Sequence, residues 1–379
     1  MRIGIVGEFN PFHNGHKYFI DKIKEKYPDS FIVLVMSGNF TQRGIPSIYD
    51  KWDKSKIAIN NGIDLVVELP FVFATQSADY FAKGSIQILN YLKVDKVIFG
   101  SESDDIDTLK EIAIIQNNDA FNTLVKLYCK NGYNYPTALS MAIEESIGKK
   151  ITTPNDLLGI SYIKEIINNK YNIEIETIKR TNDYHDTNIN NTISSATAIR
   201  EAIKNNIDYT KQVPNNSLKY FNDLHFIDDY FNILKYKIIT EEDLYKYQTV
   251  SKEIIPRLKK EILEVNSIDE LIKRVNIKTD TYNKISRMLL HILVNFTKEK
   301  AKSFNNIKYI RVLGFNNNGR KILNDIKKDI DVPIISKINR EKDEMLEFEI
   351  ETSKIYYLNN TSKIEREYNN KLYMEDNND

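Results

Sequence analysis

The chain has 379 residues, enough for two or three domains that each bury a core, and its 53 Lys and Arg balance 53 Asp and Glu, so overall charge recruits no polyanion. The single cysteine, Cys129, excludes an intrachain disulfide framework and a multi-cysteine zinc site. No signal-peptide pattern opens the chain and no apolar run approaches a membrane span, so we expect a cytoplasmic protein that does not associate with a membrane.

The first 27 residues predict a strand, a tight loop and a helix. Residues 1–6 form a β-rich run of strand length, and in residues 17–27 the apolar side chains recur at helical spacing. His13 and His16 stand three positions apart where the helix begins, so the two imidazoles share a face with the free backbone N–H groups of the first turn. This combination favours a phosphate ligand.

The spacing of the two histidines also indicates their chemistry. Imidazoles placed in this way can donate hydrogen bonds to a phosphate oxygen that gains charge as a bond breaks, and Gly15 allows the ligand to approach the backbone closely. The segment 13–16, HNGH, resembles the HxGH signature of nucleotidylyltransferases and class I aminoacyl-tRNA synthetases. That resemblance implies attack on the α-phosphate of ATP with release of pyrophosphate. The alternative is that both histidines only cap the helix.

Four more runs predict strands, at 31–36, 65–69, 96–100 and 173–178, and helices are expected at 51–61 and 78–92. Buried strands that alternate with helices form right-handed βαβ units. We therefore expect an α/β fold with a Rossmann-like, doubly wound parallel sheet. In such sheets ligands bind beyond the carboxyl ends of the strands. The loops at 10–16, 37–44, 68–70 and 100–102 are thus expected to converge on one crevice.

A second candidate phosphate-binding segment follows the fifth strand. Residues 193–200, ISSATAIR, place Ser194 and Ser195 at a helix start and Arg200 about a turn and a half further on, so all three can face one anion. The segment resembles the ISSTxIR motif, which in the same superfamily holds the β- and γ-phosphates. The alternative for the two serines, as for Asn155 in the turn 153–156, is simple helix capping.

The sequence after about residue 205 is expected to be helical, at 221–235, 241–247, 254–265, 268–275 and 281–301. Between residues 251 and 330, 18 Lys and Arg stand against 9 Asp and Glu. Lys284 and Arg287 lie beside an apolar stripe of the last of these helices and are candidates for contacts with RNA phosphates. The alternative is that they only solvate the helix.

The C-terminal part predicts a small α+β unit. We expect strands at 308–315 and 332–336, a helix at 319–328, candidates for further strands at 348–351 and 355–358, and a loose tail after residue 373.

Taken together, the motifs resemble one family, the tRNA(Met) cytidine acetate ligases. The matching segments are 7–16 (GEFNPFHNGH), 36–44 (MSGNFTQRG), 64–71 (DLVVELPF), 99–102 (FGSE), 154–159 (PNDLLG), 194–200 (SSATAIR) and 311–315 (RVLGF). The resemblance implies ATP-dependent N4-acetylation of the wobble cytidine, C34, of elongator tRNA(Met). Acetate would attack the α-phosphate of ATP to give acetyl-adenylate and pyrophosphate, and the cytidine amine would then take the acetyl group.

The resemblance also implies a set of site residues. His13 and His16 are expected on the α-phosphate, and Ser195 and Arg200 on the departing pyrophosphate. The remaining ATP-site positions are Gly7, Glu8, Phe9, Asn10, Pro11, Phe12, Asn14, Gly15, Lys17, Tyr18, Phe19, Ile20, Gly100, Asn155, Arg180 and Thr181. Arg43 is a candidate for the acetate carboxylate or the tRNA. Mg²⁺ is expected to arrive with ATP, because no carboxylate cluster suggests a metal site of the protein's own.

On this basis the chain divides into a catalytic ATP-binding domain (1–205), a helical, basic, tRNA-binding region (206–305) and a small C-terminal α/β unit (306–379). No protein partner is evident. Two other functions stay open at this point: a small-molecule nucleotidylyltransferase that makes a dinucleotide or coenzyme, and a non-catalytic RNA-binding protein that keeps an ATP-binding fold.

Overall fold

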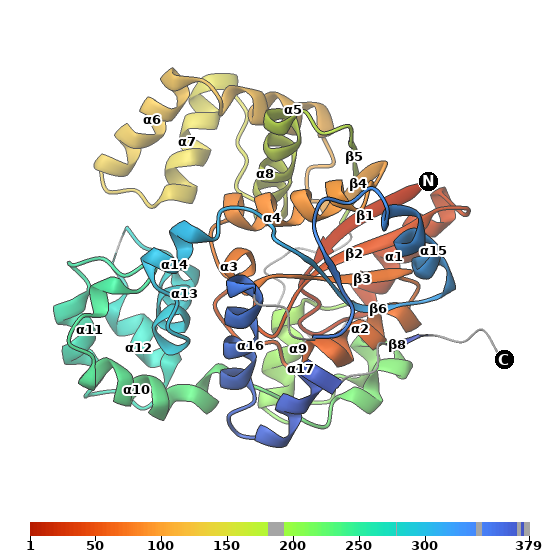
Figure 1. Cartoon of the computed structure of the whole chain (residues 1–379). Helices are drawn as coiled ribbons and strands as arrows, with labels where there is room; N and C mark the ends of the chain where they lie inside the picture. Colours follow the sequence, from red (N-terminus) through yellow and green to blue (C-terminus); the bar gives the residue numbers. More distant parts are fainter. Residues whose placement is uncertain (181–192, 278, 339–342, 370–372, 375–379) are drawn as a thin grey trace.

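The computed structural model describes residues 1–180, 193–277, 279–338, 343–369 and 373–374 (Figure 1). Its strands are β1 (Arg2–Gly7), β2 (Phe31–Ser37), β3 (Leu65–Leu69), β4 (Lys96–Ser101), β5 (Glu174–Lys179), β6 (Ile310–Phe315), β7 (Ile334–Ile335) and β8 (Tyr373–Met374). Its α-helices are α1 (Asn14–Lys26), α2 (Lys51–Asn60), α3 (Phe71–Ala74), α4 (Ala78–Tyr91), α5 (Ile106–Ile115), α6 (Asp119–Lys130), α7 (Tyr135–Ile147), α8 (Pro154–Asn169), α9 (Ala196–Lys204), α10 (Phe231–Thr240), α11 (Ile255–Glu261), α12 (Ile268–Val275), α13 (Tyr282–Leu293), α14 (Lys298–Ser303), α15 (Asn317–Ile326), α16 (Glu344–Tyr356) and α17 (Arg366–Asn369).

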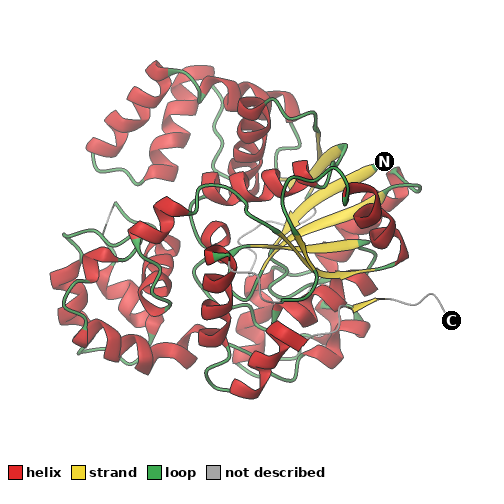
Figure 2. Ribbon diagram, viewed as in Figure 1, coloured by secondary structure: helices red, strands yellow, loops and turns green. Residues whose placement is uncertain are grey.

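The sheet confirms the predicted doubly wound fold. Its strand order is β5-β4-β1-β2-β3-β6-β7, and β1 to β5 are parallel. From β1 the chain proceeds through β2 and β3 to one side and through β4 and β5 to the other. The order therefore reverses between β1 and β4, and a ligand is expected where these two strands end. Figure 2 shows the strands twisting side by side with helices on both faces.

Both faces of the sheet are buried, and β2 shows how. Its side chains alternate between two hydrophobic clusters, with Val33 and Val35 in one and Ile32 and Leu34 in the other. The first cluster extends into α4 and α8, and the second packs under α1 and α2. Figure 1 shows α5–α8 above the sheet and α10–α14 beside it. In the described part of the chain, no helix is long and apolar enough to cross a bilayer.

The C-terminal part joins the main sheet. β6 pairs antiparallel with β3 and parallel with β7 and β8, so the sheet is mixed at this edge. The candidate strands at 348–351 and 355–358 are wrong, because these residues belong to α16 or directly follow it. The buried side chains of α16 include Met345, Phe348 and Thr352, which recur at helical spacing, and the Asp343 carboxylate caps the helix by accepting the Leu346 N–H.

The region 206–305 is helical as predicted, but its boundaries differ. Residues 221–235 are helical only from Ile227 onwards, and 241–247 contains one 3₁₀ turn, Leu244–Lys246. The helix expected at 281–301 divides into α13 and α14. The break falls where Asn295 adopts a φ of +62° and Thr297 begins the next helix by accepting the Lys300 N–H.

A buried ionic cluster fastens the C-terminal helices to the sheet. Lys51 of α2 lies 2.8 Å from Glu68 of β3 and 3.0 Å from Glu367 of α17. Arg311 of β6 contacts the same two carboxylates, at 3.3 and 2.8 Å. Glu349 of α16 accepts the Phe71 N–H at 2.6 Å, and burial together with nearby Glu68 raises the pKa of its carboxyl. Removal of one member therefore leaves opposite charges buried without compensation.

Replacing Lys51 by Met should lower the free energy of unfolding by about 3–5 kcal/mol, because Glu68 and Glu367 would lose a cation inside the core. Urea unfolding measures the change. Lys56→Met on the same helix is the matched control, since Lys56 is partly exposed, pairs with Asp53 and lies 6.0 Å from the Tyr220 ring centroid, and it should cost about 1 kcal/mol or less. Equal stability of the two variants would contradict a structural role for the cluster.

Candidate active site

The first turn of α1 is held by a reciprocal pair of histidine caps. His13 is the N-cap, and its Nδ1 accepts the Gly15 N–H at 3.0 Å. The Nδ1 of His16 accepts the His13 N–H at 3.2 Å. Because each Nδ1 is an acceptor, the proton of each neutral ring must lie on Nε2. The Nδ1 atoms therefore cap the helix, as the alternative interpretation expects, and these hydrogen bonds fix the direction of the Nε2–H groups.

Both imidazoles are neutral. Burial lowers the pKa of His13 to about 3, with further contributions from Arg180 and Arg200. Burial, His13 and Arg180 lower the pKa of His16 well below its usual value. The two rings stack with centroids 3.7 Å apart. Among the described residues, none forms a hydrogen bond with either Nε2, so two neutral N–H donors are open to a ligand.

Aromatic side chains of the loop after β1 pack against the ring of His16. Phe9, at a φ of +48°, lies 4.6 Å from the His16 ring and 4.9 Å from Phe12 between centroids. A Cβ at Gly7 would lie 2.9 Å from the Phe9 ring, so the glycine permits this contact. Phe12 and Ile20 are fully buried in the core. Their side chains therefore shape the loop and helix from within.

Two further contacts fix the loop after β1. Asn10 accepts the Ile48 N–H at 2.7 Å and donates to the Pro46 carbonyl at 3.2 Å. Lys54 of α2, fully buried, donates to the carbonyls of Glu8 at 3.1 Å and Ser37 at 2.7 Å. It thereby ties the loops after β1 and β2 together. Sequence reasoning missed Lys54, because a lysine on an amphipathic helix usually reaches solvent.

The second motif lies against the first. Arg200 of α9 donates from Nη1 to the Asn10 carbonyl at 2.5 Å and from Nη2 to Thr197 Oγ1 at 3.2 Å. Ser195 is the N-cap of α9, with its Oγ accepting the Ala198 N–H at 3.1 Å, so its capping alternative is also correct and the hydroxyl proton is still available. A Cβ at Gly15 would lie 3.3 Å from Ile193. The same Cβ would lie 2.9 Å from the His13 ring, so the glycine leaves room for that ring and for the second motif.

Another group of predicted residues lies at the end of β4. Asn155 donates to Glu102 Oε1 at 2.5 Å, and Arg180 Nε lies 3.7 Å from the same oxygen. A Cβ at Gly100 would lie 3.2 Å from the Arg180 side chain. Asn155 is not the helix cap, since it lies in the first turn of α8 and the N-cap position is Thr153, which makes no side-chain capping bond. Glu102 received no role of its own from the sequence, although a charged residue directly after a buried strand is typical of a ligand-binding edge.

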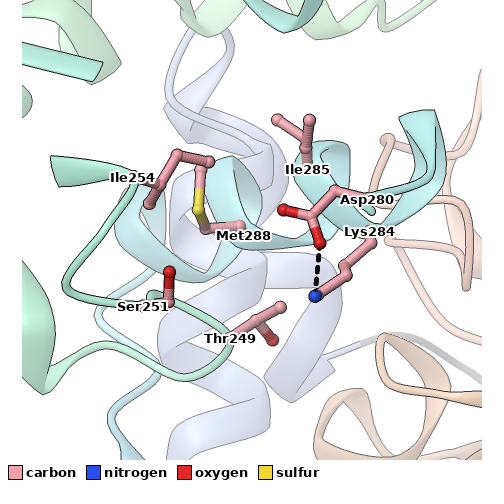
Figure 3. Close-up of a pocket in the computed structure, with 7 residues that line it drawn as sticks. All are labelled: Thr249, Ser251, Ile254, Asp280, Lys284, Ile285 and Met288. Atoms are coloured by element: carbon pink, nitrogen blue, oxygen red, sulfur yellow. Dashed lines mark hydrogen bonds and ion pairs between the residues drawn. The ribbon is translucent and has the colours of Figure 1, made fainter. Parts of the chain in front are cut away.

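The three candidate substrate residues lie in two different places: Arg43 and Arg287 at the loop after β2, and Lys284 in the helical region. Arg43 donates to Thr197 Oγ1 at 2.8 Å, the same oxygen that accepts from Arg200. Arg287 donates to the Gln42 carbonyl at 3.0 Å, next to Arg43 in the loop after β2. Lys284 instead pairs with Asp280 at 2.5 Å in a small pocket of the helical region (Figure 3). That pocket is lined by Thr249, Ser251, Ile254, Asp280, Lys284, Ile285 and Met288.

The other predicted positions surround the first turn of α1. Asn14 donates to the Lys211 carbonyl at 2.8 Å, and Lys17 pairs with Asp21. Tyr18 and Phe19 are half-buried on the same helix. Thr181 lies outside the described residues. Within the described ranges, no three His, Cys, Asp or Glu side chains gather to hold a metal ion.

The chain is similar to known proteins along almost its whole length. The model of the HIGH Nucleotidyl Transferase family matches residues 1–371. The tRNA(Met) cytidine acetate ligase of Clostridium novyi (strain NT) is 38% identical, with 95% of each chain covered. A protein of the same name from Clostridium perfringens is also 38% identical, over 96% of this chain and 97% of the relative.

Two crystal structures of Thermotoga maritima TmcAL have the same fold. The apo form superimposes with a TM-score of 0.91 and 28% identity, covering 98% of this chain and 99% of the other. The form bound with alpha-thio ATP gives a TM-score of 0.85 and 29% identity, covering 94% of each chain. The family expected from the motifs is confirmed: the chain is a HIGH nucleotidyl transferase that belongs to the tRNA(Met) cytidine acetate ligase family.

Proposed function

We propose that the protein is an ATP-dependent ligase that activates acetate as acetyl-adenylate, releases pyrophosphate and acetylates N4 of the wobble cytidine, C34, in elongator tRNA(Met). The names of its relatives and the alpha-thio ATP bound to T. maritima TmcAL support this assignment. The observation that carries it is the contact between Arg200 and the Asn10 carbonyl. That contact joins the two phosphate-binding motifs into one site.

In the first step, a carboxylate oxygen of acetate forms a bond to the α-phosphorus, and the bond from that phosphorus to the bridging oxygen breaks. The Nε2–H groups of His13 and His16 donate to α-phosphate oxygens as their negative charge grows. They need not lose or gain a proton, because both rings are neutral. Arg200 and the Ser195 hydroxyl stabilise the departing pyrophosphate.

In the second step, the N4 amine attacks the acetyl carbon, the carbon–oxygen bond to AMP breaks, and the amine loses a proton. An amine conjugated to a pyrimidine is a poor nucleophile, so it requires an acyl group activated as a mixed anhydride. Asn155 and Arg180 would hold the nucleoside and its phosphates, with Gly100 leaving room beside them. Mg²⁺ would come bound to the phosphates of ATP.

The tRNA would reach this site from the basic helical region 206–305, and we place the reaction in the cytoplasm. Acetate and elongator tRNA(Met) are then the partners besides ATP. Arg43 and Arg200 both donate to the Thr197 hydroxyl oxygen. The guanidinium of Arg43 could therefore bind either the pyrophosphate or the acetate carboxylate.

Purified protein should exchange labelled pyrophosphate into ATP only when acetate is present, because acetate is the group that accepts the adenylate. Labelled acetate should then be transferred to elongator tRNA(Met) and not to the same tRNA with C34 replaced by uridine. Exchange that ignores acetate would indicate a small-molecule nucleotidylyltransferase. A complete absence of exchange would indicate an RNA-binding protein without catalysis.

The two nitrogens of His16 can be tested separately. The Asn side chain reaches about as far as Nδ1, and Gln about as far as Nε2. His16→Asn should keep an acceptor for the His13 N–H but lose the phosphate donor, and the exchange rate should fall by about 10²–10³. His16→Gln should retain more of that rate. Lys22→Met, on the outer side of α1, is the control and should exchange normally. Full exchange by His16→Asn would contradict the assigned role.

A further inference from the structure

Helix α13 of the helical region packs directly on the loop 37–44 that follows β2. Gly44 has a φ of +77°, and a Cβ there would lie 2.3 Å from the backbone nitrogen of Arg287. Ser286 Oγ donates to the Gly44 carbonyl at 3.1 Å. A side chain at Gly44 would separate the two elements, so the glycine keeps the helix and the loop in backbone contact.

The peptide groups on both sides of Gln42 are held by opposite charges. The Glu8 carboxylate, from the loop after β1, accepts the Gln42 N–H at 2.6 Å. The guanidinium of Arg287 donates to the Gln42 carbonyl at 3.0 Å. Burial lowers the pKa of Arg287 to about 10 and nearby Glu8 opposes this shift, so Arg287 is charged at neutral pH. Two charge-assisted hydrogen bonds thus define where Gln42 lies.

The next residue along the loop is Arg43, which extends to the site. Its guanidinium donates to Thr197 Oγ1 at 2.8 Å, and the same hydroxyl oxygen accepts from Arg200 at 3.2 Å. A continuous set of contacts therefore leads from α13 through Gln42 to Arg43 and, through Thr197, to Arg200 of the proposed ATP site. Orientation at such a site matters, because a misplacement of about 1 Å can cost about 100-fold in rate.

We infer that Arg287 is a positioning residue for the adenylation step: it fixes the Gln42 peptide so that Arg43 lies beside Arg200 at the triphosphate. The inference rests on the proposed function and deepens it. It gives the helical region a part in the chemistry that precedes tRNA binding. From the sequence Arg287 is a candidate for contacts with RNA phosphates; in the structure it donates to the Gln42 carbonyl in the loop after β2.

The test is acetate-dependent ATP–pyrophosphate exchange measured without RNA. Arg287→Met should lower kcat for exchange by about 10- to 100-fold. Arg287→Lys should recover part of the loss, since it keeps the charge but not the planar fork. Arg274→Met is the matched control, because Arg274 is a half-exposed arginine of neighbouring α12 paired within the helical region, and its exchange should equal that of the wild type. Thermal unfolding of each variant reports any general loss of structure.

A double variant tests whether Arg287 acts through Arg43. Adding Arg287→Met to Arg43→Met should change exchange little further, because residues acting in one chain of contacts are not additive. Independent, multiplying losses would overturn the inference. So would normal exchange by Arg287→Met with a raised KM for tRNA, which is the outcome for an RNA contact. Wild-type exchange without acetate would contradict the proposed function instead, so the two failures are distinguishable.

Discussion

The proposed adenylation site depends on the reciprocal hydrogen bonds of His13 and His16 at the start of α1. Each imidazole uses Nδ1 to accept a backbone N–H, and each must therefore carry its proton on Nε2. Burial and the neighbouring arginines hold both rings neutral. In each ring Nδ1 is thus the structural cap and Nε2–H the proposed phosphate donor. The capping and catalytic interpretations, which compete at the level of sequence, are compatible in the structure.

Arginines from distant parts of the chain lie beside this pair or beside the second motif, residues 193–200. Arg200 belongs to α9, Arg180 directly follows β5, and Arg43 lies in the loop after β2. Each is oriented by a defined contact, with Asn10, Glu102 and Thr197 respectively. A triphosphate that entered here would meet donors already in place, which lowers the reorganisation needed when charge develops.

Sequence reasoning found the sheet and both motifs because their signals are local: apolar runs, helical spacing and histidines three apart. It failed where a position is set by tertiary contacts. Residues 344–356 form a helix that buries Glu349 in an ionic cluster, and no local pattern shows that its carboxyl lies beside Lys51. Lys54 and the contacts of Thr197 were missed for the same reason; the loop 100–102 was expected at the crevice, but the contacts of Glu102 were not. Their importance lies in partners from other segments.

Nitrogen-15 NMR of histidine-labelled protein tests the central claim most directly, and the His16→Asn and His13→Asn variants assign the signals among the five histidines. The account predicts that, from mildly acidic to mildly alkaline pH, both rings stay neutral with Nδ1 unprotonated and a proton on Nε2, and that ATP shifts the two Nε2 signals. A proton on either Nδ1, titration near the ordinary pKa of about 6.5, or Nε2 signals that ignore ATP would contradict it.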